Sequence, residues 1–181
     1  MNSLLGHLTR HASLLAEQAK LTADIAAFRS DYQARLDSGA ADETAIRALT
    51  ALRTQIEVSE ARLAQLAREL VGSDLMICAA IQHHRDLLLR RLILLAAKRR
   101  EQVEGVFIER LGVTAPDARR ILVDLNRRHK PPVFRSLSRT ITLVESISAS
   151  PKDAESPAAR GERLLAVNVE AHSDVALTGL Q

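Results

Sequence analysis

Apolar residues recur along the first part of the chain at the spacing of an α-helix. Between Ser3 and Leu36 they follow one another at intervals of three, four and seven residues, which keeps them on one face of a helix. This stripe consists of Leu14, Leu21, Ile25, Phe28 and Tyr32. We therefore expect one long helix over about residues 3–36.

A strict seven-residue period follows a predicted chain reversal at residues 37–42. Gly39 can end the first helix, and the carboxylate of Asp42 can accept hydrogen bonds from the first turn of the next. The later apolar positions form two coiled-coil seams, Leu49, Ile56, Leu63 and Leu70, with Leu52 and Leu66 beside them. This pattern predicts an elongated helical hairpin, a coiled-coil interaction module over residues 1–84.

The segment Val71–Gly72–Ser73–Asp74 allows two interpretations. Gly72 can end the second helix while Ser73 or Asp74 caps a third, or the segment is an irregularity within one very long helix. Either way, the apolar face continues to about Lys98.

Residues 133–147 follow Lys130–Pro131–Pro132, which cannot continue a helix. They are rich in β-branched residues, and apolar and polar positions alternate, which predicts a β-hairpin or strand. Apolar residues at helical spacing, Leu137, Ile141, Val144 and Ile147 behind a Ser136 cap, support a helix instead. Residues 149–181 read as a linker and flexible tail, with one short strand expected over residues 164–169.

Composition narrows the class of protein. Aromatic residues make up 2% of the 181 residues, so aliphatic side chains and alanine must fill the core, as in coiled coils. The single cysteine, Cys78, has apolar neighbours and is expected to be a buried small hydrophobe in a reducing compartment. Because the amino terminus lacks a secretory pattern and charges interrupt residues 75–97, we expect a cytoplasmic protein without membrane contact.

The net charge of +3 is unevenly distributed. Residues 1–84 carry −2, residues 85–139 carry +8 and residues 140–181 carry −3. The central segment could bind a polyanion, although solvated arginine-rich helix faces give the same pattern.

Within that basic segment, residues 104–129 have the pattern of a helix-turn-helix. A first helix ends at Leu111, Gly112 provides the turn, and Thr114 and Asp117 form a capping box at the start of the second helix. Four residues would face inward, Ala118, Ile121, Leu122 and Leu125, and three outward, Arg119, Arg120 and Arg127. A plain junction between two helices of a bundle would explain the spacing equally well.

The run Leu-Gly-Val-Thr at 111–114, followed by Ala-Arg-Arg at 118–120 and Leu122 and Leu125, resembles the winged helix-turn-helix domains of bacterial regulators. The likeness covers residues 87–147 at most. It implies that Thr114, Ala115, Arg119 and Arg120 lie near base edges of double-stranded DNA, and that Arg127, Arg128, Lys130, Arg135 and Arg139 meet phosphates. The chain departs from the pattern at Ile108, at Pro131–Pro132 and in a wing without glycine.

No constellation points to catalysis. His7 and His11 make an incomplete metal site, and the adjacent His83 and His84 diverge by about 100° on a helix. The sequence contains no phosphate-binding loop, dinucleotide, zincin or nucleophile-elbow motif. We therefore predict no enzyme, no cofactor and no metal.

Together these patterns predict a mainly α protein with an elongated helical hairpin or coiled-coil bundle. A small basic helix-turn-helix domain, winged if the resemblance holds, follows over residues 85–148, and a tail over residues 149–181. The expected function is non-enzymatic DNA binding or regulation, with self-association or a protein partner bound through residues 1–100. The alternative is a structural coiled-coil adaptor that binds other proteins.

Overall fold

The computed structural model describes residues 2–39, 42–128 and 132–177, with side chains except at 2, 132–135 and 170–177. Within these ranges the chain forms α1 (Asn2–Asp37), α2 (Glu43–Leu111), α3 (Ala115–Arg128), α4 (Pro132–Glu145) and α5 (Pro157–Leu177). The mainly α fold class is confirmed, and no β-strand occurs in the described ranges. None of the described helices combines the length and apolar character needed to cross a membrane.

The chain divides into two compact units, residues 2–77 and residues 78–181, and the division falls within α2. This helix is continuous over 69 residues, so Gly72 does not end a helix. A glycine inside a helix costs about 1 kcal/mol relative to alanine. The hydrogen bonds and packing of the helical turns on either side outweigh that cost.

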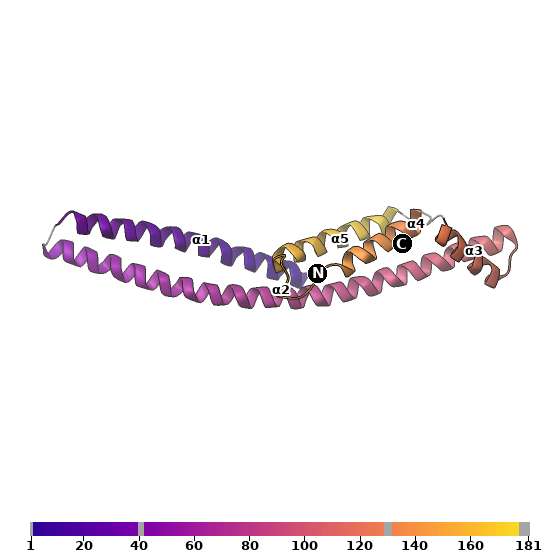
Figure 1. Cartoon of the computed structure of the whole chain (residues 1–181), viewed down its shortest axis with the longest axis horizontal. Helices are drawn as coiled ribbons and strands as arrows, with labels where there is room; N and C mark the ends of the chain where they lie inside the picture. The colour runs from indigo at the N-terminus through magenta and orange to yellow at the C-terminus, as the bar shows by residue number, and fades with distance from the viewer. Residues whose placement is uncertain (1, 40–41, 129–131, 178–181) are drawn as a thin grey trace. The chain divides into compact units, whose positions relative to one another are not determined.

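In the unit of residues 2–77, α1 and the first part of α2 form an antiparallel helical hairpin (Figure 1). Leu14 and Ile25 of the predicted stripe are buried, and Leu66 of the second heptad seam is fully buried. Two ion pairs join the helices, Arg29 with Glu60 at 2.6 Å and Arg62 with Glu17 at 2.8 Å. The hairpin predicted from the heptads is therefore confirmed, and Gly39 at its turn has a φ of 66°.

In the unit of residues 78–181, α4 and α5 contact each other beside the last part of α2 (Figure 1). α4 runs antiparallel to this part of α2, and α5 runs parallel to it. The buried apolar side chains of the unit include Ile81, Leu88, Leu92, Val144, Ile147, Leu164 and Val167. Cys78 is also buried, as the sequence predicted.

The β-hairpin expected over residues 133–147 is wrong, because α4 occupies this segment from Pro132 to Glu145. β-branched residues have only a weak strand preference, which packing overrides. Here the period of 3.6 places Val144 in the core. The hydroxyls of Thr140 and Thr142 donate to the carbonyls four residues earlier, so these polar groups are satisfied within the helix. The helix also begins before Ser136, which is therefore not its cap.

The strand expected over residues 164–169 is wrong, because α5 runs through this segment from Pro157 to Leu177. The start of this helix has a capping residue that the linker interpretation overlooked. Ser156 Oγ accepts a hydrogen bond from the amide of Ala159 at 3.3 Å, and Pro157 occupies the first helical position. Leu164 and Val167 are then buried at helical spacing.

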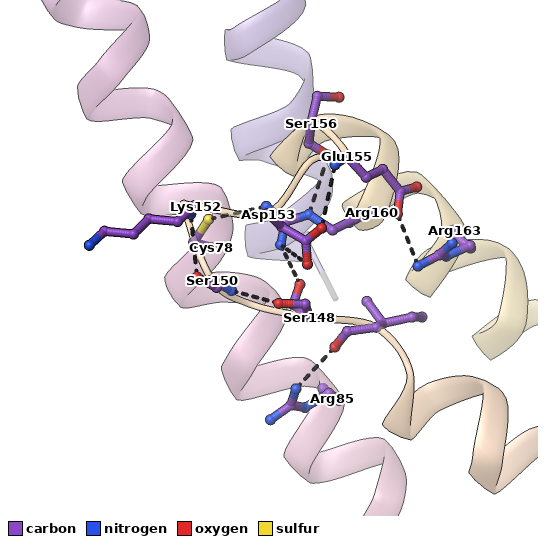
Figure 2. Close-up of polar contacts among 11 residues, drawn as sticks. Cys78, Arg85, Ser148, Ser150, Lys152, Asp153, Glu155, Ser156, Arg160 and Arg163 are labelled. Atoms are coloured by element: carbon purple, nitrogen blue, oxygen red, sulfur yellow. Dashed lines mark hydrogen bonds and ion pairs between the residues drawn. The ribbon is translucent and has the colours of Figure 1, made fainter.

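A buried arginine connects α5 to the segment that precedes it (Figure 2). Arg160 is 1% exposed, and its guanidinium donates to the carbonyl of Ser148 at 2.8 Å. The same group lies 3.7 Å from the carboxylate of Asp153 and 4.0 Å from the sulfur of Cys78 in α2. Residues 149–156, read from sequence as part of a linker, are thus folded around a buried charge.

Candidate nucleic-acid interface

The turn between α2 and α3 has the geometry that the sequence predicted. Gly112 has a φ of 62°, in the left-handed region that favours glycine, and its amide donates to the carbonyl of Ile108 at 3.0 Å. Residues 112–114 separate the helices, and the amide of Ala118 donates to the carbonyl of Thr114 at 2.9 Å.

At the start of α3, the two residues of the expected capping box bind each other through their side chains. The hydroxyl of Thr114 donates to the carboxylate of Asp117 at 2.7 Å, so the two side chains bind each other. Asp117 also pairs with Arg120 at 3.2 Å. A negative charge in the first turn is favourable because it faces the positive end of the helix dipole.

One face of α3 is buried. Ala118 is 0% and Leu122 4% exposed, while Ile121 and Leu125 of the predicted inner face are half-buried. Thr114, Ala115 and all four arginines of this region are exposed. α3 is therefore an amphipathic helix with a basic outer face, as expected.

Carboxylates partly neutralise this basic face. Arg119, whose side chain is 70% exposed, pairs at 3.1 Å with Glu104 of α2, whose side chain is only 13% exposed. Arg120 pairs with Asp117, and Arg128 pairs with Asp124 at 3.0 Å. Among the residues that the structure describes, Arg127 makes no ion pair. The pairs of Arg120 and Arg128 lie three and four residues apart on α3, a spacing visible in the sequence. The pairing of Arg119 could not be read from the residue pattern, because Glu104 lies on another helix.

The remaining predicted phosphate contacts lie on or before α4. Arg139 is exposed there, whereas Lys130 and the side chain of Arg135 lie outside the described residues. The structure brings Arg139 to a groove of about 920 Å³, lined also by Ala96 and Arg100 of α2 and Asn126 of α3. Sequence reasoning missed Arg100, although the basic run Lys98–Arg99–Arg100 was an available signal.

His83 and His84 are adjacent on α2. The rings of His83 and His84 lie edge to face with centroids 5.4 Å apart. Among the described residues, no group of three or more histidine, cysteine or acidic side chains is arranged to hold a metal ion. Burial lowers the pKa of His84, with a further contribution from the neighbouring His83.

Comparison with known proteins does not add to this geometry. No protein-family model, curated protein or solved structure matches the chain.

Proposed function

We propose that this protein is a non-enzymatic DNA-binding or regulatory protein, and that the basic outer face of α3 contacts double-stranded DNA. The observation that carries the proposal is the amphipathic character of α3 after a three-residue turn. Ala118 and Leu122 are buried, and Arg119, Arg120 and Arg127 face outward. An exposed basic helix held by its apolar face is what entry into a major groove requires.

Electrostatics supports a polyanionic partner. The segment 85–139 carries a charge of +8, between segments of −2 and −3. The ion pairs on α3 do not prevent binding, because exposed pairs contribute only about 0–1 kcal/mol each. Phosphates can therefore displace the carboxylates of Asp117 and Asp124, at a cost of up to about 1 kcal/mol for each pair.

The described residues contain no β-hairpin wing, and this changes the expected contacts. A winged domain would place a β-hairpin beside its recognition helix, whereas here α4 follows α3. The proposal thus rests on the helices alone, with Arg139 of α4 as a candidate phosphate contact.

Binding to a short labelled duplex, followed by fluorescence anisotropy over a series of salt concentrations, tests the proposal. We expect affinity to fall steeply with salt, because bound phosphates release counterions. The double change Arg119→Ala and Arg120→Ala should weaken binding more than the matched pair Arg10→Ala and Arg68→Ala in residues 2–77. Failure of the unaltered protein to bind duplex at low salt would overturn the proposal.

A second candidate, a structural coiled-coil adaptor, is favoured by one specific observation. Leu87 and Leu94 of α2 are one heptad apart and 49% and 70% exposed, and Ile93 beside them is 56% exposed. Exposed apolar side chains at this spacing suit a partner helix. If this candidate is right, Leu87→Gln with Leu94→Gln should abolish a self-association or partner complex detected by sedimentation, without affecting DNA binding.

A further inference from the structure

Polar side chains from three helices converge on one hollow of the unit formed by residues 78–181. Arg100 of α2, Asn126 of α3 and Arg139 of α4 all line the groove of about 920 Å³. Arg100 and Asn126 also line an adjoining hollow of about 210 Å³ that includes Arg119. The two hollows share these residues and so connect the groove to the basic face of α3.

The arginines of the groove differ from most of those on α3. Within the described ranges neither Arg100 nor Arg139 makes an ion pair, whereas Arg119, Arg120 and Arg128 each bind a carboxylate. A phosphate that meets a paired arginine must displace its carboxylate, while an unpaired guanidinium offers all its donors at once. Unpaired arginines should therefore contribute more to the affinity for a polyanion.

The lining of the groove suits the sugar-phosphate backbone better than unstacked bases. Guanidinium groups bind phosphate oxygens bidentately, and asparagine and serine side chains are common phosphate donors. Leu137 and Ile141 in the lining offer apolar contact to a sugar. No aromatic side chain is among the lining residues described, so these residues offer no stacking platform of the kind typical of single-strand binding.

One acidic residue belongs to the same lining. Glu145 lies six residues beyond Arg139 on α4, a separation of about 9 Å along the helix axis. Among the described residues that line the groove, no other carboxylate accompanies the two arginines and Asn126. Glu104 lies in the adjoining hollow, where it is paired with Arg119.

We propose that this groove holds the phosphate backbone of the bound duplex, and that Arg100 and Arg139 are its principal phosphate contacts. This proposal rests on the proposed DNA-binding function and deepens it. It adds Arg100 to the DNA interface. It also implies that the groove contributes more to the affinity for duplex DNA than the outer face of α3 does.

The test compares Arg100→Gln and Arg139→Gln with two controls, Arg120→Gln on α3 and Arg68→Gln on the first part of α2. Each groove variant should lose about tenfold in duplex affinity at low salt and reduce the salt slope by about one. Arg120→Gln should lose less, and Arg68→Gln should match the unaltered protein. Melting curves of every variant check folding, and Ser138→Asp provides a second variant that keeps both arginines and should weaken binding through repulsion.

The outcomes separate the two proposals. If the unaltered protein binds duplex but the groove variants and Ser138→Asp bind equally well, the groove assignment is wrong and the DNA-binding function stands. A larger loss in Arg120→Gln than in Arg100→Gln would likewise overturn the ranking. If the unaltered protein does not bind duplex, both proposals fail.

Discussion

The guanidinium of Arg160 in α5 donates a 2.8 Å hydrogen bond to the backbone carbonyl of Ser148, twelve residues earlier in the chain. Arg160 is almost completely buried, and Asp153 supplies the opposite charge. The pKa of Asp153 is lowered mainly by a hydrogen bond from the side chain of Ser148, then by the amide of Glu155, with Arg160 contributing less. These contacts hold the loop before α5 in one conformation.

Replacing Arg160 should therefore destabilise the fold. Arg160→Ala removes the partner of the part-buried Ser148 carbonyl and leaves a cavity, and we expect a loss on the order of 3 kcal/mol. Arg163→Ala is the matched control, because Arg163 is 42% exposed and pairs with Glu155 at the surface. Denaturant unfolding measures the free energy of unfolding of both variants. Equal losses would show that the buried contacts of Arg160 do not contribute to stability.

Removing the partner of Arg119 should strengthen DNA binding under the proposed function. Glu104→Gln keeps the shape of the side chain but leaves the guanidinium of Arg119 without its carboxylate. Duplex affinity at low salt should rise several-fold, and the gain should shrink as salt is added. Glu109→Gln, on the same helix, is the control for the change in net charge. Equal gains in affinity in both variants would show that the change in net charge, and not the release of Arg119, explains the result.

Stability should fall when the pH drops below about 6.5. Burial lowers the pKa of His84 from its ordinary value of 6.5, so the unfolded chain takes up this proton at a higher pH than the folded one. The stabilisation is complete above pH 6.5 and is lost as the pH falls through the folded-state pKa. Melting temperatures over this range should depend less on pH in His84→Gln. His83→Gln, at an exposed position, should keep most of the dependence.

Gly72 inside α2 and Gly112 just after its end should respond to alanine substitution with opposite changes in stability. Gly112 has a φ of 62°, which is strained for any other residue except asparagine, so Gly112→Ala should cost about 1 kcal/mol. Gly72 lies inside the helix, and a Cβ there would meet nothing within 4 Å. Gly72→Ala should therefore stabilise the protein by about 1 kcal/mol. Thermal unfolding measures both variants. Changes in stability of the same sign would contradict this prediction.

The hairpin of residues 2–77 should depend on the second heptad seam more than on the first. Leu66 is 0% exposed, whereas Leu63 is only half-buried. Leu66→Ala should cost about 3 kcal/mol, and Leu63→Ala clearly less. Denaturant unfolding that ranked Leu63 above Leu66 would indicate a different register.

Much of the helical architecture follows from local patterns. The stripe of α1 and the heptads of α2 are each long and regular, and such periods can be satisfied only by helices. The turn at Gly112 and the basic face of α3 also depend on neighbouring residues alone. For this reason the placement of Arg119 and Arg120 at the surface was predicted correctly.

Residues 133–177 were predicted less well because their local signals are contradictory. β-branched residues in α4 favour a strand, and Ser-Pro dipeptides before α5 favour a linker, while the apolar spacing in both segments fits a helix. Short segments of this kind take the structure that buries most apolar surface. That surface belongs to other helices, so the local sequence could not decide.

The sequence by itself determined where the long helices form, where α3 begins and which arginines face outward, because these depend on contacts within a few residues. Tertiary structure alone decided that Arg160 is buried, that Glu104 neutralises Arg119 and that Arg100 shares a groove with Arg139. Each of these relationships joins residues from different elements. The interaction energies depend on the distances between these side chains and on their burial, and neither can be read from the order of residues in the chain.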